Sequence, residues 1–187
     1  MEPYPVRFSV DYPDRALNRV TTAFRIFTLI PIAIIIGTIG SAVFAGLVLM
    51  LLFRKKYPWW WYAWNLELSR FSNRVSAYAL LMDDRYPSTA TDQSVHLEWP
   101  QVTGAEVSRG LPLVKWFLAI PHYIVLFFLW IALVFVAIYA WFAILFTGRY
   151  PRGAFRFVEG VLRWGNRVAG YAYALVTDAY PPFRLSD

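Results

Sequence analysis

One short motif carries the residue types best suited to chemistry, and it occurs twice. Each occurrence has two arginines four residues apart with an asparagine between them. The residues are Arg70, Asn73 and Arg74 in the first occurrence and Arg163, Asn166 and Arg167 in the second. On a helix, residues four apart are neighbours on one face, and paired guanidinium groups can hold a phosphate bidentately. The motif therefore predicts two sites for the headgroups of anionic lipids, with a solvated polar face as the simpler alternative.

The remaining polar residues favour no catalytic, metal or cofactor site. No zinc-protease, hydrolase or nucleotide-binding motif occurs. The absence of cysteine excludes disulfides and thiol catalysis. His96 lies in a polar linker and His122 near the start of an apolar stretch, which argues against a shared haem. Asp83, Asp84 and Asp178 precede Tyr-Pro turns, where aspartate usually makes local hydrogen bonds.

The two motifs lie on helices that the sequence predicts to have an aromatic face and a cationic face. Apolar residues recur at spacings of three and four over 61–82 and again over 154–175. A basic amphipathic helix rich in aromatic residues is typical of the lipid–water interface.

A second interpretation has these helices cross the bilayer, and the sequence leaves it open. An unpaired charge costs about 2.5–3.5 kcal/mol at the bilayer centre. A crossing therefore requires partners inside a bundle, such as Glu67 with Arg163 or Glu159 with Arg70. The number of crossings, two or four, stays open as well.

Two long apolar stretches precede these helices. Residues 20–53 contain one charge, Arg25, and residues 110–146 contain one charge, Lys115. Both stretches far exceed the roughly 18 apolar residues that indicate a membrane helix. The first also carries a stripe of small residues, which is typical of close helix packing in membranes. The stripe consists of Gly37, Ser41 and Ala45.

Matching strings predict an internal duplication. RIFTLIP at 25–31 matches KWFLAIP at 115–121, and RFSNRVSAYA at 70–79 matches RWGNRVAGYA at 163–172. Such periodicity is the signature of repeated structural units. Each unit reads as a short extended segment, a long apolar transmembrane helix, a Tyr-Pro turn and an amphipathic helix. The first repeat is expected at 1–87 and the second at 88–187, together forming one membrane domain.

The two extended segments allow two interpretations. Residues 6–10 and 94–98 alternate between apolar and polar side chains and end near an aromatic-Pro pair. They are either two strands that pair with each other or two solvated linkers.

Composition sets the expected class of protein. Of the 187 residues, 58% are hydrophobic and 16% are charged, whereas a soluble domain has about 25% charged residues. We therefore expect an all-α integral membrane protein built from the tandem repeat. The net charge of +6 favours anionic lipids as partners over nucleic acid.

Several strings resemble the DUF4389 family, a domain of unknown function. They are WFAILFTGRYPRGAFRFVEGVLRW at 141–164, the preceding Ile-Pro-His, the closing TDAYPPF and the opening YPVRFSVDYP. The resemblance extends over nearly the whole chain as two tandem copies. It is weaker in the first copy, where Arg-Lys-Lys at 54–56 replaces Thr-Gly-Arg. The resemblance implies a bacterial integral membrane protein and supplies no activity, substrate or catalytic residue.

Three classes of function follow from these observations. The first is a non-enzymatic integral membrane module, either an accessory or scaffold subunit or a self-assembling protein, with basic amphipathic helices at the lipid interface. The second is a small channel or transporter built from the repeat, and the third is a lipid-modifying enzyme. Because residues 1–19 lack the features of a signal peptide, we expect a multi-pass protein of the inner (cytoplasmic) membrane with a cytoplasmic N-terminus. A homo-oligomer or a larger membrane complex is the expected assembly.

Overall fold

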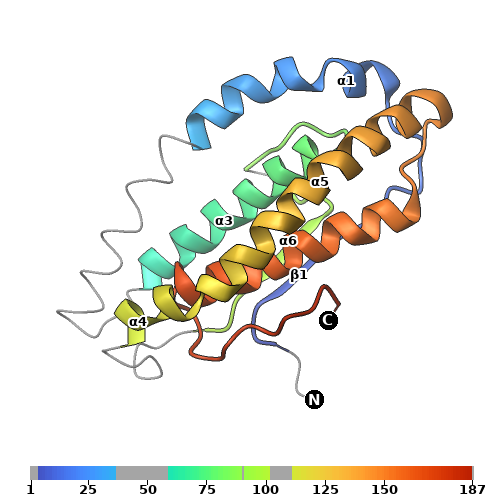
Figure 1. Ribbon diagram of the computed structural model, residues 1–187. Coiled ribbons are helices and arrows are strands. Elements are labelled where there is room, and N and C mark those ends of the chain that lie inside the picture. Colours follow the sequence, from blue (N-terminus) through green and yellow to red (C-terminus); the bar gives the residue numbers. More distant parts are fainter. Residues whose placement is uncertain (1–3, 37–58, 90, 102–110, 187) are drawn as a thin grey trace.

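The structure, a computed structural model, describes residues 4–36, 59–89, 91–101 and 111–186 (Figure 1). The main elements in chain order are β1 (Arg7–Val10), α1 (Arg19–Ala23), α3 (Trp59–Ala79), β2 (Val95–Glu98), α4 (Leu111–Leu118), α5 (Ile120–Thr147) and α6 (Arg152–Ala172). A short apolar helix, Arg25–Ile36, follows α1.

The two extended segments form a two-stranded antiparallel sheet. Phe8 lies opposite Leu97, and Val10 lies opposite Val95. These four side chains are buried, while the residues between them are exposed. Alternation therefore places one face of each strand in the core. The interpretation as paired strands is confirmed.

The helices form layers on this sheet. β1 packs against α6, β2 packs against α3, and α5 lies along the opposite side of α6 (Figure 1). One apolar core joins the layers, and it includes Phe8 and Leu97 of the sheet, Val158 of α6 and Leu133 of α5. Helix α6 is central because it contacts both the sheet and α5.

The turn between α5 and α6 follows directly from its sequence. Gly148 adopts the left-handed conformation with φ of 74° and donates its N–H to the carbonyl of Ile144. Glycine ends helices in this way because it lacks a Cβ. Tyr150 is buried, and Pro151 is the N-cap of α6. The turn folds α6 back along α5.

The prediction of an all-α integral membrane protein built from a tandem repeat is wrong. The fold is mixed, because α3 and α6 pack on a two-stranded sheet. Within the described ranges, α5 alone is long and apolar enough to cross a membrane, so a multi-pass arrangement is not supported either. Half of the first predicted apolar stretch, residues 37–53, lies outside the described residues.

A glycine on α6 provides a test of the packing at the centre of the fold. A Cβ at Gly160 would lie 2.9 Å from the Cβ of Leu185 and 3.1 Å from its carbonyl oxygen. We expect Gly160→Ala to lower the free energy of unfolding by about 1–3 kcal/mol, because overpacking forces the backbone apart. Thermal unfolding in detergent measures the change.

Gly153 on the same helix is the matched control. A Cβ there meets nothing within 4 Å, so Gly153→Ala should be neutral or stabilising, since alanine favours helix. Equal stability of the Gly160→Ala protein and the wild type would contradict the packing described above.

Candidate functional site

The first arginine of each motif fixes a strand of the sheet to a helix. On α3, Arg70 Nε donates to the carbonyl of Leu97 at 3.1 Å. On α6, Arg163 Nε donates to the carbonyl of Phe8 at 2.9 Å. Since Leu97 and Phe8 are opposite each other in the sheet, the two arginines attach both strands at the same level.

Each of these arginines pairs with a glutamate on its own helix. Arg70 Nη1 lies 2.6 Å from Glu67 Oε1, and Arg163 Nη2 lies 2.8 Å from Glu159 Oε1. The glutamates therefore pair within their own helices and not across helices, as Glu67 with Arg163 and Glu159 with Arg70 would in a membrane-crossing bundle. Residues three or four apart on a helix are already neighbours, so the charges find partners locally.

The second arginine of each motif holds the chain that follows its helix. Arg74 Nη1 donates to the carbonyl of Ser88 at 2.7 Å. Arg167 Nη1 donates to the carbonyls of Ser186 at 2.9 Å and Arg184 at 3.3 Å. Both arginines are buried. Their charged donors therefore satisfy backbone oxygens in segments that have no sheet or helix partners.

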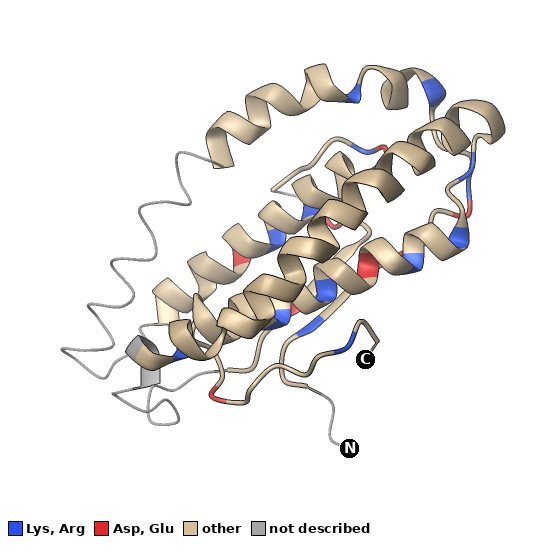
Figure 2. Cartoon of the chain, viewed as in Figure 1, with Lys and Arg blue, Asp and Glu red and all other residues tan. Residues whose placement is uncertain are grey.

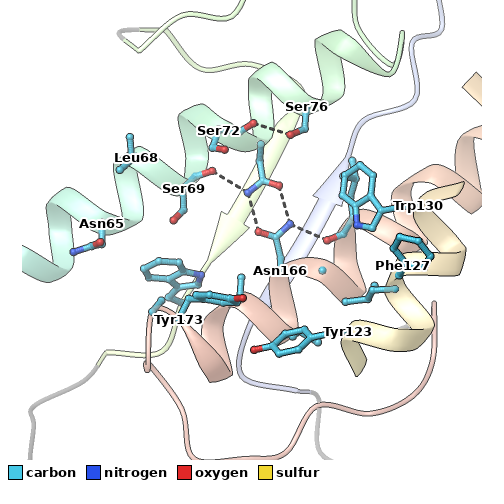
Figure 3. A pocket seen from close by; sticks show the side chains of 18 residues that line it. Asn65, Leu68, Ser69, Ser72, Ser76, Tyr123, Phe127, Trp130, Asn166 and Tyr173 are labelled. Atoms are coloured by element: carbon cyan, nitrogen blue, oxygen red, sulfur yellow. Dashed lines mark hydrogen bonds between the residues drawn. The ribbon is translucent and has the colours of Figure 1, made fainter. Parts of the chain in front are cut away.

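The two asparagines join α3 to α6 through a reciprocal pair of hydrogen bonds (Figure 3). Asn73 Nδ2 donates to Asn166 Oδ1 at 2.8 Å, and Asn166 Nδ2 donates to Asn73 Oδ1 at 2.7 Å. Each amide also donates to a carbonyl one turn earlier, of Ser69 and Leu162 respectively. Both donors of each amide are thus in use, and each side-chain oxygen keeps acceptor capacity.

All six residues predicted to bind lipid headgroups therefore belong to one network that connects helices, strands and loops. Arg74, Arg163 and Arg167 are buried, and the side chain of Arg70 is 33% exposed. Headgroup capture by these residues stays a prediction. The predicted packing stripe of Gly37, Ser41 and Ala45 lies outside the described residues.

Two buried cations complete the network, and the sequence marked them only as lone charges in apolar stretches. Arg25 Nη1 donates to the carbonyls of Tyr78 at 2.6 Å and Asp83 at 2.5 Å. Fully buried Lys115 donates to the carbonyl of Thr177 at 2.7 Å and pairs with Asp178 at 2.6 Å. Each cation thus binds the turn that follows a motif helix.

The two aspartates after α3 accept hydrogen bonds from residues both near and distant in sequence. Asp83 accepts hydrogen bonds from the hydroxyl of Ser94 at 2.7 Å and from Arg85 Nε at 2.9 Å. Asp84 accepts from Arg15 Nη1 at 2.8 Å. The expectation of local hydrogen bonding is confirmed for Asp83, which binds Arg85 two residues away, whereas the partners of Asp84 are distant in sequence.

These contacts decide the acidity of both aspartates. Burial alone would raise the pKa of Asp83, but hydrogen bonds from Arg85 and Ser94 outweigh it and hold the pKa below its usual value. Burial would likewise raise the pKa of Asp84. Hydrogen bonds from Arg15 and from the backbone N–H of Asn18 outweigh this effect, so the pKa of Asp84 is lowered as well.

The histidines lie in different settings. His122 is buried, and its Nδ1 accepts from Trp164 Nε1 at 3.0 Å while its ring stacks on Phe183. His96 Nε2 lies 2.9 Å from Asp11 on the surface. In the part of the chain that the structure describes, no group of three or more metal-ligating side chains is assembled.

A pocket of about 600 Å³ lies beside the asparagine pair, and it was not anticipated from the sequence. Helix α3 lines one wall with Ser69, Ser72 and Ser76, and α5 lines the other with Tyr123, Leu126, Phe127 and Trp130 (Figure 3). Gly165 and Asn166 of α6 contribute to the lining as well. The serine spacing on α3 was a possible signal, because residues three and four apart share a helix face.

Comparison with protein families identifies part of the chain. Residues 112–184 match the model of DUF4389, a domain of unknown function. This single match supports the resemblance over α5 and α6, and it does not support two tandem copies or a bacterial origin. No curated protein and no solved structure shows a significant match to the chain.

The asparagine pair can be tested by a double-mutant cycle. We expect Asn73→Ala to lower the free energy of unfolding by about 1–3 kcal/mol, because it leaves Asn166 without its partner. Removing both amides should cost less than the sum of the single changes. Melting temperatures of the four proteins in detergent measure the coupling.

Asn65→Ala is the control, since Asn65 lies on the same helix and donates within it, to the Trp61 carbonyl. Additive losses would argue against the pair.

Acidity should weaken the turn after α3. A carboxyl with a lowered folded pKa stabilises the fold above its unfolded pKa, near the usual 3.8, and this stability is lost as pH falls through the folded pKa. We expect Asp83→Asn to lose about 1.5–3 kcal/mol at pH 7, with a smaller difference from wild type below pH 4. Thermal melts across pH measure this, with exposed Asp92→Asn as the control. A difference that stays constant down to pH 3 would contradict the role given to the carboxylate.

Proposed function

We propose that the protein is a non-enzymatic membrane module that embeds one apolar side in the bilayer and presents its charged layer to the aqueous phase. The observation that carries the proposal is the surface of α5. This 28-residue helix has a mean hydropathy of 2.7 over its most apolar window, and only 17% of that window is buried. A core helix of a soluble protein would be buried for the most part.

The exposed side chains of α5 are large and apolar along its whole length. They include Ile124, Phe128, Ile131, Phe135, Ile138 and Phe146, each more than 40% exposed. Soluble monomers rarely expose contiguous apolar patches larger than a few hundred Å². Burial of this surface in lipid is favourable by about 25 cal/mol per Å² of apolar area removed from water.

The short helix Arg25–Ile36 extends the same apolar surface. Its residues Ile26, Phe27 and Ile34 are exposed. The segment before it is attached to α5, because Trp141 Nε1 donates to the carbonyl of Thr22 and Arg19 donates to the carbonyl of Phe146. A membrane-embedded surface therefore involves two helices.

The charged residues lie elsewhere. Figure 2 shows charges on α3, α6, the strands and the loops, whereas α5 has none. Because the motif arginines are bonded to backbone carbonyls, we assign membrane contact to α5 rather than to basic faces of α3 and α6. The net charge of +6 still favours anionic membranes by electrostatic attraction. Self-association and a role as an accessory or scaffold subunit belong to the same proposal.

Charged substitutions on α5 test the proposal. We expect Phe128→Lys/Phe135→Lys to reduce flotation of the purified protein with phosphatidylcholine–phosphatidylglycerol liposomes by tenfold or more, because a lysine costs about 2.5–3.5 kcal/mol at the bilayer centre. Circular dichroism checks that the variant is folded.

The matched control adds the same two charges at exposed polar positions in the loops around β2, Thr91→Lys/Gln101→Lys. This control should float like the wild type. Wild-type protein that stays in the aqueous fraction, or a folded α5 variant that floats as well as the control, would overturn the proposal.

A further inference from the structure

The pocket between α3, α5 and α6 joins two unlike walls and contains no charge. Its α5 wall is aromatic and aliphatic, and its α3 wall consists largely of serine and asparagine (Figure 3). All of the described lining residues are uncharged. Its volume of about 600 Å³ lies within the range of sites for small ligands.

The polar groups of the pocket suit a ligand that carries hydroxyl groups. The donors of Asn73 and Asn166 are used within the protein, but their side-chain oxygens can each accept a further hydrogen bond. The half-buried hydroxyls of Ser69 and Ser72 on the same wall can donate or accept. A ligand hydroxyl can donate to an asparagine oxygen and also accept a hydrogen bond from a serine hydroxyl.

The apolar wall connects the pocket to the proposed membrane surface. Phe127 and Trp130 line the pocket and are also 61% and 44% exposed. They are neighbours of the exposed residues Ile124, Phe128 and Ile131 on α5. An acyl chain can therefore extend from the pocket onto the lipid-facing side of α5.

We propose that this pocket binds the hydroxylated head and proximal chain of an uncharged amphipathic lipid. This inference rests on the proposed membrane association. The uncharged lining distinguishes it from a phosphate site, because a buried phosphate needs cationic partners. The ligand is thus different in class from the anionic lipids that the arginine motif predicted.

A glycine in the pocket wall allows a direct test. Gly165 lines the pocket, and a Cβ there meets nothing within 4 Å, so Gly165→Leu adds a bulky side chain at the pocket wall without a clash at its Cβ. The full chain is placed in phosphatidylcholine nanodiscs that contain small equal amounts of dioleoylglycerol and dioleoylphosphatidylglycerol. Native mass spectrometry of the released protein measures the retained lipid. Gly153→Leu is the matched control, because Gly153 lies on the same helix, outside the pocket, and also meets nothing within 4 Å.

We expect dioleoylglycerol to be retained by the wild type and by Gly153→Leu, and retained about tenfold less or worse by Gly165→Leu. Liposome flotation should be equal for all three proteins. If Gly165→Leu does not fold, Ser69→Ala/Ser72→Ala replaces it and must reduce retention of the same probe.

Each of the following results would overturn the inference. The first is that variant and wild type retain dioleoylglycerol equally, and the second is that the wild type preferentially retains dioleoylphosphatidylglycerol. The third is a fall in the oligomeric mass of the Gly165→Leu protein, because a second copy of the chain would then be the occupant of the pocket. Wild-type protein that floats but retains no dioleoylglycerol refutes this inference alone. Wild-type protein that does not float refutes the proposed function as well.

Discussion

Backbone carbonyls outside helices and strands need hydrogen-bond donors, and in this protein buried cations supply many of them. Arg25 and Lys115 bind the turns after the two motif helices, and Arg74 and Arg167 bind the segments beyond those turns. A buried carbonyl without a donor destabilises the fold, and so does a buried cation without an acceptor. In this protein the buried cations donate to the carbonyls, and the carbonyls are the acceptors that the cations require. The irregular segments, which make up much of the chain around α3 and α6, depend on this exchange for their position.

The same exchange explains why a pattern that looked like a lipid-binding surface is largely internal. In an isolated amphipathic helix, arginines on the polar face extend to water or to phosphate. Here the polar faces of α3 and α6 have strands beside them, so Arg70 and Arg163 reach the carbonyls of Leu97 and Phe8. The residue types and spacing were those of a phosphate site. In the structure these two arginines bind the protein's own backbone.

The sequence predicted the local elements better than their assembly. Alternation at 6–10 and 94–98 indicated strands as one of two interpretations, and the apolar run after Pro121 predicted α5. The overall class was wrong because hydropathy does not show what a helix packs against. The pocket was missed because three helices form it. The sequence shows the serines on one face of α3, but it does not show that α5 lies opposite them. Lone charges such as Lys115 were visible, but their carbonyl partners are far away in sequence.

The pairing of β1 with β2 also constrains the order in which the chain can fold. The paired residues Arg7 and Glu98 are about 90 residues apart, and closing so long a loop is entropically costly and slow compared with local helix formation. During synthesis, the first strand must wait until the second has left the ribosome, and Arg163 of α6 emerges later still. The helix α5 is made before that last arginine, so its exposed apolar surface needs a chaperone or a membrane while the layer beneath it is incomplete.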